Sequence, residues 1–230
     1  ALALIPPRLA GYLLSRERHE AAVQRDLAAE PAPLFEPRGP LLATGELAER
    51  PLRVFVSAAE HSGEIHAANL IDAVRAEAAA AGLPEPDFRG LGGPALVERG
   101  VASVGDPGSR AAMGFDGVLA ALPFYLGLLR DAAAEAAAWR PDLYLPVDSP
   151  ALHLPLARLV RRASPATRAV HLVTPQYWGW APWRVAAYAK AFHLGLSILP
   201  FEPRWYARHG VAATYVGHPL LDELAELGVG

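Results

Sequence analysis

Residues 53–64 read RVFVSAAEHSGE, and this stretch decides the fold. A short apolar run rich in β-formers (53–57) ends in a polar loop, and apolar side chains then recur at helical spacing from Gly63 to Ala81. A strand that runs directly into a helix is the first half of a βαβ unit. We therefore expect residues 53–57 to be the first strand of an open α/β sheet.

The same alternation of strand and helix continues to residue 216. Right-handed crossovers join such strands into a parallel sheet, so the fold class that we predict is α/β, a Rossmann-like parallel sheet of about six or seven strands flanked by helices. Pro123 is expected to break or kink one helix. The expected strands are 53–57, 87–91, 102–104, 143–147, 168–173, 193–199 and 213–216, and the expected helices are 63–81, 94–99, 115–139, 151–163, 182–191 and 202–209.

Polar loops rich in glycine and proline follow several of the expected strands. In an open α/β sheet, ligands bind beyond the carboxyl ends of the strands, so these loops predict the rim of an active site. A P-loop is missing, and Gly90-Leu91-Gly92-Gly93 follows the second strand rather than the first, so an NTPase or a dinucleotide enzyme is not supported. The rim loops are 57–64, 92–94, 147–150, 174–180 and 217–219.

The composition excludes several classes of function. The chain has 230 residues, of which 52% are hydrophobic and 20% charged, enough for a substantial core. A net charge of −3 is no electrostatic match for nucleic acid. Because there is no cysteine, disulfides and thiolate catalysis are excluded. The histidines have no spacing typical of a ligand set, which argues against a metal site.

We expect a boundary near residue 50. A short polar helix is expected at 16–29, and the prolines between Pro31 and Pro40 are typical of a linker. The chain starts at Ala1 rather than at Met and stops at Gly230 without an evident cap, so we expect it to be part of a longer protein. On this interpretation residues 1–50 are a linker or the tail of an upstream segment, and residues 51–230 form the domain.

The first rim loop has a functional and a structural interpretation. Ser62 and Gly63 fall at the expected helix start, where free backbone N–H groups favour an anion or a sugar oxygen. Glu60 and Glu64 add acidic groups to the same rim. The structural alternative is that Ser62 is an N-cap and Glu64 a favourable acid in the first helical turn.

Asp148 also has two interpretations, because it directly follows the apolar run 143–147. A carboxylate at this edge of the sheet is a candidate general base. Its alternative role is to cap the helix that follows Pro150.

Aromatic side chains are concentrated between residues 174 and 183. Trp178 and Trp180 are suited to stack on a sugar or to fill a lipid-facing groove, and their alternative is burial in the core. Arg184 is placed to meet a phosphate, and its alternative is a solvated helix face.

These motifs, in this order and at this spacing, resemble lipid-A-disaccharide synthase over about residues 52–222. The family patterns Gly-Glu-x-Ser-Gly-Asp, Asp-Ala-Pro-Asp-Phe-Asn and Ser-Pro-x-x-Trp-Ala-Trp are similar to residues 59–64, 148–153 and 174–180. The chain departs from these patterns at Ala59, Glu64, Ala151 and His153, where the family has Gly, Asp, Asp and Asn. Further matches are Gly-Gly-Pro at 92–94, an Ala-Val-Met-Gly-like loop at 111–114, Leu-Pro-Phe-Glu at 199–202 and Gly-His-Pro at 217–219.

The resemblance implies a glycosyltransferase B fold, of which residues 51–230 are the amino-terminal, acceptor-binding Rossmann-like half, with the carboxy-terminal donor domain absent. It implies a transferase that moves 2,3-diacylglucosamine from UDP to 2,3-diacylglucosamine 1-phosphate, giving the β-1,6 disaccharide of lipid A. It also implies no metal or other cofactor, and a cytoplasmic enzyme held peripherally on the inner face of the cytoplasmic membrane. The competing class is a non-catalytic or sugar-nucleotide epimerase-like Rossmann module left by truncation.

The resemblance also implies roles for individual residues. Asp148 would be the general base, Glu60 and Ser62 would orient the sugar, and the apolar stretch Met113–Leu129 would hold acyl chains or rest on the bilayer. The alternative for that stretch is a buried helix. The substrate-binding residues implied are Glu60, Ser62, Gly63, Glu64, Met113, Trp178, Trp180, Arg184 and His218.

Overall fold

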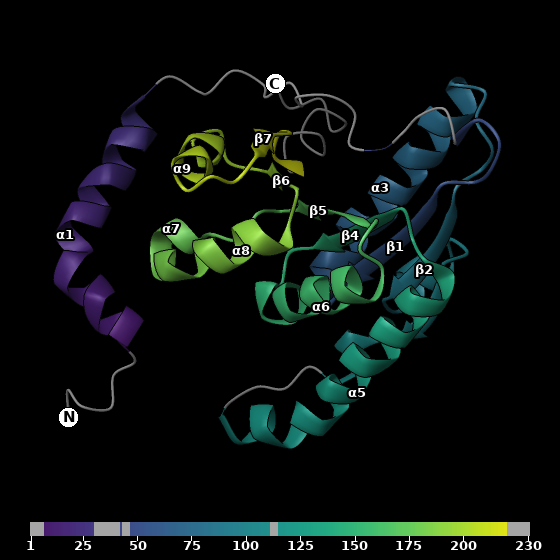
Figure 1. The fold of residues 1–230 in the computed structure, drawn as a ribbon, viewed down its shortest axis with the longest axis horizontal. Helices are drawn as coiled ribbons and strands as arrows, with labels where there is room; N and C mark the ends of the chain where they lie inside the picture. Colours follow the sequence, from purple (N-terminus) through teal and green to yellow (C-terminus); the bar gives the residue numbers. More distant parts are fainter. Residues whose placement is uncertain (1–6, 30–41, 43–46, 111–114, 220–230) are drawn as a thin grey trace, which may run out of the picture. The chain divides into compact units, whose positions relative to one another are not determined.

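The computed structural model describes residues 7–29, 42, 47–110 and 115–219 (Figure 1). Within them, seven strands form one sheet in the order β3-β2-β1-β4-β5-β6-β7. The strand pairs whose registers are defined are all parallel. Helices flank the strands, so the Rossmann-like α/β fold expected from the sequence is confirmed.

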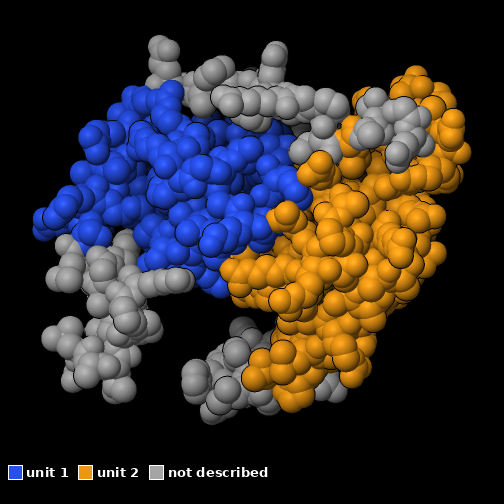
Figure 2. Space-filling model, in the orientation of Figure 1, with its two compact units in different colours: residues 1–36, 174–230 blue, residues 37–173 orange. Residues whose placement is uncertain are grey.

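The chain divides into two compact units, which Figure 2 shows in different colours. Unit 2 (residues 37–173) contains β1 (Arg53–Ala58), α3 (His61–Ala80), β2 (Asp87–Leu91), α4 (Pro94–Val97), β3 (Ala102–Gly105), η2 (Pro107–Arg110), α5 (Phe115–Trp139), β4 (Leu143–Val147), α6 (Pro150–Ala163) and β5 (Arg168–Leu172). Unit 1 (residues 1–36 and 174–230) contains α1 (Pro7–Ala28), α7 (Tyr177–Trp180), η3 (Pro182–Arg184), α8 (Val185–Ala191), β6 (Leu194–Ser197), α9 (Glu202–Arg208) and β7 (Ala213–Tyr215).

The interior of unit 2 is built around β1. Val54, Phe55 and Val56 are fully buried, because a central parallel strand is covered on both faces and its sequence is apolar throughout. Strand β1 lies between β2 and β4, with Val56 opposite Gly90 and Leu145. Gly90 has φ +152°, and a Cβ added there would lie 1.7 Å from the Val56 carbonyl oxygen. Only glycine therefore fits at this point of close strand approach.

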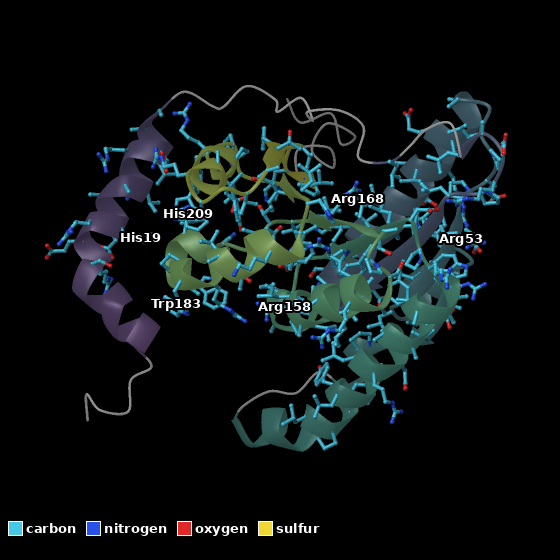
Figure 3. All side chains as sticks on the ribbon, in the orientation of Figure 1. His19, Arg53, Arg158, Arg168, Trp183 and His209 are labelled. Carbon is cyan, nitrogen blue, oxygen red and sulfur yellow. The ribbon has the colours of Figure 1, made fainter. Side chains whose placement is uncertain are left out.

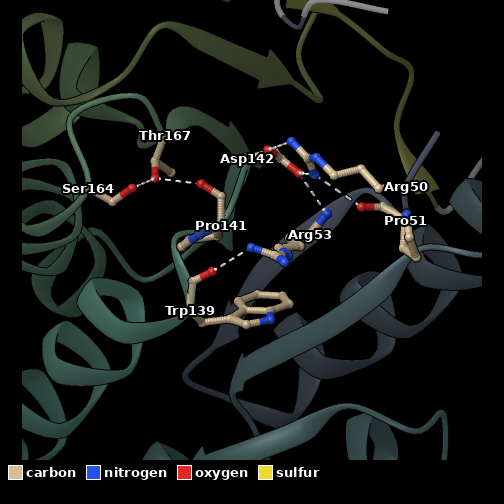
Figure 4. A network of polar contacts seen from close by, with 8 residues as sticks. All are labelled: Arg50, Pro51, Arg53, Trp139, Pro141, Asp142, Ser164 and Thr167. Atoms are coloured by element: carbon tan, nitrogen blue, oxygen red, sulfur yellow. Dashed lines mark hydrogen bonds and ion pairs between the residues drawn. The ribbon is translucent and has the colours of Figure 1, made fainter. Parts of the chain in front are cut away.

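Asp142 ties the amino ends of β1 and β4 together (Figure 4). Its carboxylate accepts two hydrogen bonds of 2.7 Å from the Arg50 guanidinium and one of 3.0 Å from the Arg53 backbone N–H. Partial burial acts to raise the pKa of Asp142, but the hydrogen bonds and charges of Arg50 and Arg53 outweigh it and hold that pKa below its ordinary value. The Arg53 side chain also donates to the Trp139 carbonyl at 3.1 Å, which secures the end of α5.

Helix α5 runs without interruption from Phe115 to Trp139, so Pro123 does not break it, and the predicted kink at Pro123 stays a prediction. Proline removes one backbone donor, and a helix continues where its other hydrogen bonds and packing hold. Leu122 and Leu126, one helical turn apart, are 49% and 56% exposed. No helix among the described residues is long and apolar enough to cross a membrane.

Helix α1 is longer than the sequence predicted. We expected a helix at 16–29, and it spans Pro7–Ala28, so the predicted start is wrong. Its apolar residues fall in two clusters, at 9–14 and 21–28, on either side of the polar run 15–20, so they give no continuous helical periodicity from which the start can be predicted. The assignment of residues 1–50 as a linker or tail, and of 51–230 as one acceptor-binding domain, stays a prediction.

Within unit 1, α1 packs against η3 and α9. Val23 and Asp26 are buried, and Asp26 pairs with the Arg208 guanidinium through both carboxylate oxygens. His19, which Figure 3 labels on α1, forms a hydrogen bond with the Trp178 carbonyl. The helix is thus held by both apolar and polar contacts.

The other predicted elements agree with the structure to within two residues at each end, with two exceptions. Residues 174–180, expected as a loop, include the short helix α7, and the expected helix 182–191 begins as the 3-10 turn η3 before α8. The turn η2 was not predicted. Short turns of this kind have no apolar period long enough to recognise in a sequence.

Candidate functional site

Asp148 lies at the carboxyl end of β4, in the turn that leads into α6. Asp148 and Ser149 both have left-handed backbone conformations, with φ of +52° and +41°. This region is uncommon for residues other than glycine. Ser149 is the N-cap residue of α6, and no side chain caps the helix. The alternative interpretation of Asp148 as a helix cap is therefore wrong.

Two buried histidines contact the backbone of Asp148. Its carbonyl oxygen accepts a hydrogen bond of 2.6 Å from His153 Nδ1 on α6 and one of 2.8 Å from His171 Nε2 on β5. Its N–H donates to the Leu172 carbonyl at 2.9 Å. Three hydrogen bonds therefore hold the Asp148 peptide groups in the unusual conformation.

The protonation of both imidazoles follows from these contacts. A carbonyl oxygen only accepts hydrogen bonds, so His153 carries its proton on Nδ1 and His171 carries its proton on Nε2. Burial lowers the pKa of His153 to about 4 and that of His171 to about 3, so both rings are neutral near pH 7. The bare Nε2 of His153 then accepts a hydrogen bond of 3.0 Å from the buried Ser57 hydroxyl.

The Asp148 carboxyl is half-buried and has a raised pKa. Burial is the main cause, the backbone N–H of Ser149 opposes it, the charge of Glu60 raises the pKa further, and His66 lowers it. A carboxylate with a raised pKa binds a proton more strongly than an ordinary aspartate. This property suits a general base that works near neutral pH.

Glu60 comes from the first rim loop and reaches the turn that holds Asp148. Its carboxylate accepts a hydrogen bond of 3.3 Å from the Ser149 hydroxyl. Helix α3 begins at His61 with Glu60 as its N-cap residue, so the alternative interpretation of Ser62 as the N-cap is wrong. Ser62 is instead an exposed residue in the first turn of α3.

Gly63 is buried where α3 comes close to the end of β4. A Cβ added at Gly63 would lie 3.6 Å from the Val147 carbonyl oxygen, directly before Asp148. The structure therefore places Glu60, Gly63 and Asp148 in one small region of unit 2.

Glu64 has a structural contact. It is only 6% exposed, and its carboxylate accepts a hydrogen bond of 2.6 Å from the Gly93 backbone N–H. A side chain at position 93 would meet this carboxylate at 2.5 Å. Glu64 thus joins α3 to the loop between β2 and α4, while its role in substrate binding stays a prediction.

Unit 1 has its own polar centre around Glu202, at the start of α9. This carboxylate is fully buried and accepts hydrogen bonds from the Thr174 hydroxyl at 2.9 Å, the Ser197 hydroxyl at 2.6 Å and the Trp178 indole N–H at 2.9 Å. Burial raises the pKa of Glu202 against these hydrogen bonds. The indole N–H of Trp178 is therefore used inside the unit.

The remaining aromatic candidates divide into buried and exposed side chains. Tyr177 is fully buried, whereas Trp180 is 51% exposed. The Arg184 guanidinium lies 5.8 Å from the Tyr177 ring centre and 5.6 Å from that of Trp180, within range of a cation–π contact to both. His218 follows β7 and is partly exposed, and Met113 lies outside the described residues.

The candidates thus form two groups, one in each unit. Glu60, Gly63 and Asp148 lie together in unit 2, and Trp178, Trp180 and Arg184 lie on α7 and η3 in unit 1. Among the residues that the structure describes, no group of three or more His, Asp or Glu side chains is placed to hold a metal ion.

Sequence reasoning missed the residues that support both groups. These are Ser57, His153 and His171 beneath Asp148, and Glu202 beneath Trp178. A signal existed for two of them: His153 replaces an Asn in the family pattern, and Glu202 ends the Leu-Pro-Phe-Glu match. The pattern itself does not say which backbone group such a residue contacts.

The half-buried Asp148 carboxyl lies beyond the carboxyl end of a central strand of a Rossmann-like sheet. This arrangement is typical of an α/β enzyme that binds a ligand at the strand ends. Comparison with known proteins is more specific. The family model for lipid-A-disaccharide synthetase matches residues 54–227, and the chain belongs to this family.

Curated relatives named lipid-A-disaccharide synthase agree with this result. The chain is 37% identical to one from Chromohalobacter salexigens over 173 residues, which cover 75% of this chain and 43% of the relative. It is 35% identical to one from Xanthomonas euvesicatoria over 213 residues, which cover 93% of this chain and 46% of the relative. The chain therefore matches somewhat less than half the length of these relatives, and the epimerase-like alternative is not favoured.

Proposed function

We propose that the chain is the acceptor-binding part of a glycosyltransferase of lipid A biosynthesis. The donor is UDP-2,3-diacylglucosamine, the acceptor is 2,3-diacylglucosamine 1-phosphate, and the product is their β-1,6 disaccharide. Family membership supports the reaction class. The observation that carries the residue assignment is the half-buried Asp148 carboxyl with its raised pKa, next to Glu60 at the strand ends.

In the proposed mechanism, Asp148 removes the proton from the 6-hydroxyl of the acceptor. The acceptor oxygen forms a bond to the anomeric carbon of the donor, and the bond from that carbon to UDP breaks, with the electron pair leaving on UDP. Glu60 and Ser62 orient the acceptor sugar. Fixing the hydroxyl against the base lowers the entropic part of the barrier.

The donor site of this proposal belongs to a second Rossmann-like half outside this chain. The chain matches only 43–46% of the length of the relatives quoted, which leaves room for such a half in proteins of this family. The 230-residue chain alone is therefore expected to bind acceptor but to make no disaccharide.

Helix α5 is proposed to meet the acyl chains or the membrane surface. Leu122 and Leu126 are large, apolar and about half exposed on one side of the helix. Each methylene removed from water contributes about 0.8 kcal/mol, so even part of an acyl chain gives useful affinity. This contact makes the enzyme a peripheral protein of the inner face of the cytoplasmic membrane.

The test uses the chain alone and the chain fused to the unmatched carboxy-terminal part of the Chromohalobacter salexigens relative. Labelled donor and acceptor are supplied, and disaccharide and UDP are measured. We expect product from the fusion only, and loss of product with Asp148→Asn but not with Asp87→Asn, an exposed carboxylate on β2. Product from the isolated chain would contradict the need for a second half.

A further inference from the structure

Two consecutive residues with left-handed backbone conformation need an explanation. Asp148 and Ser149 both have a Cβ that crowds the backbone in this conformation, so the turn is strained. Such strain persists only where surrounding contacts hold it. The contacts that hold this turn identify the residues on which the position of the Asp148 carboxylate depends.

We propose that His153 and His171 are positioning residues that hold the Asp148 carboxylate at the rim by binding the carbonyl oxygen of the same residue. The two rings come from different elements, α6 and β5, and meet edge to face with centroids 6.0 Å apart. Both are fully buried and both donate to one oxygen. This inference rests on the proposed function of Asp148 as a base.

The arrangement requires opposite tautomers in neighbouring rings. His153 must carry its proton on Nδ1 and His171 on Nε2, since the carbonyl of Asp148 supplies no proton. The Ser57 hydroxyl donates to His153 Nε2 at 3.0 Å and so favours the required tautomer of that ring. The hydrogen bonds of the two rings therefore require one arrangement of protons, so the two histidines do more than fill the apolar core.

The hydrogen bond from His153 to the Asp148 carbonyl also accounts for a departure from the family pattern. Where this chain has His153, the pattern quoted above has Asn. An asparagine amide and a histidine Nδ1 both place an N–H one bond beyond Cγ, so either side chain can donate to the carbonyl at position 148. The substitution therefore changes the residue and leaves an N–H group that can donate to this carbonyl.

Two pairs of variants separate positioning from packing. His153→Leu and His171→Leu remove the N–H groups, whereas His153→Asn and His171→Gln keep a donor near the Nδ1 and Nε2 positions. Leu156→Ala is the matched control, because Leu156 is fully buried on the same helix as His153. It measures what a loss of core packing does by itself.

The first measurement uses the isolated chain. Nitrogen-15 NMR at pH 7 should show two neutral imidazoles of opposite tautomer, and carbon-13 NMR should show the raised pKa of Asp148. In the two Leu variants the pKa of Asp148 should fall towards the ordinary aspartate value of about 4. In the Asn, Gln and Leu156→Ala variants the pKa of Asp148 should stay raised. Identical tautomers, a charged ring, or an unchanged Asp148 pKa in the Leu variants would overturn the proposal.

The second measurement uses the active fusion. The Leu variants should lower kcat by about 10- to 100-fold with little change in acceptor KM, and the Asn and Gln variants should recover most of it. Leu variants that lose no more kcat than Leu156→Ala would show a structural role only and overturn the proposal. If the NMR results hold but the wild-type fusion makes no disaccharide, the proposed function fails and the positioning of Asp148 stands.

Discussion

Glu202 offers a test of how unit 1 holds its aromatic surface. The carboxylate is fully buried, carries no ion pair among the described contacts, and accepts hydrogen bonds from Thr174, Ser197 and Trp178. Replacing it with alanine removes the acceptor of all three donors, and replacing it with glutamine keeps its shape and removes only its charge. The two variants therefore separate the hydrogen bonds from the charge.

The cost of Glu202→Ala follows from which donors lose their acceptor. Ser197 keeps an alternative acceptor, the Leu199 carbonyl at 2.8 Å, whereas Thr174 and Trp178 lose the contact with Glu202. Each buried donor left unsatisfied costs about 1–3 kcal/mol, and relief from burying the carboxylate offsets part of this. We expect the free energy of unfolding to fall by about 3 kcal/mol.

Glu202→Gln should be nearly neutral, and its effect should depend on pH. The Gln oxygen accepts from Trp178, and the two hydroxyls can turn to accept from its amide. Burial raises the folded-state pKa of Glu202, so its stabilising contribution is fully present below the unfolded pKa of about 4.3 and is lost as pH rises through the folded pKa. The wild type should therefore lose stability relative to the Gln variant over this range.

Urea unfolding followed by tryptophan fluorescence measures these changes in the free energy of unfolding, because four of the five tryptophans lie in unit 1. The free energies of unfolding of wild type, Glu202→Gln and Glu202→Ala are compared at pH 4.5 and at pH 7.5. The difference between two variants at the same pH cancels the titration of the groups that they share. A loss below about 1 kcal/mol for the Ala variant would refute the hydrogen-bond argument. An equal difference between wild type and Gln at both pH values would refute the argument from burial.

Three further predictions concern unit 2. Asp148→Asn should lower turnover of the active fusion by about two to four orders of magnitude without a change in circular dichroism, and near-normal turnover at saturating substrate would exclude Asp148 as the base. Asp142→Asn should destabilise the chain by about 1–2 kcal/mol, since it weakens a bidentate pair with Arg50. Because the Asp142 pKa is lowered, this contribution is present above the unfolded pKa and is lost as pH falls through the folded pKa, which urea unfolding at pH 3 and pH 7 would test. Leu122→Ser with Leu126→Ser should weaken co-sedimentation with anionic vesicles and binding of acylated acceptor, and unchanged values for both would remove α5 from the lipid contact.

The elements of the sheet could be predicted from the sequence because each has a local signal. Strand β4 is an uninterrupted apolar run, and α5 is a long segment rich in the strong helix formers Ala and Leu, so both were predicted with their observed bounds. The start of α1 could not be predicted, since its apolar residues fall in two clusters, 9–14 and 21–28, without a continuous helical period, and contacts with α7 and α9 help to hold it. Contacts between distant parts of the chain leave no period in the sequence.

The site was less predictable for the same reason. The position of Asp148 follows from the strand before it, but the histidines that hold its carbonyl lie 5 and 23 residues further along the chain. Glu64 and Trp178 show the opposite error, in which a residue was predicted to bind a ligand and the structure shows a contact inside the protein. A motif residue in a rim loop is easily interpreted as a ligand contact when only the sequence is known. In the structure, Glu64 accepts a backbone hydrogen bond from Gly93, and the Trp178 N–H is bound to Glu202.

The charges around Asp148 restrict which end of the proposed acceptor is able to lie there. Glu60 and Asp148 are carboxylates close enough for the charge of one to raise the pKa of the other. An acceptor phosphate placed beside them would be repelled, by about 1 kcal/mol per unit charge at 4 Å in water and by more where water is excluded. A hydroxyl group instead has one O–H to donate, and either carboxylate can accept that hydrogen bond. The 1-phosphate and the 6-hydroxyl are separate substituents of the glucosamine ring, so the acidic rim favours the orientation that brings the hydroxyl, and not the phosphate, to Asp148. Glu60 thus serves the proposed reaction in two ways, because it strengthens the base and disfavours an acceptor bound with its phosphate at Asp148.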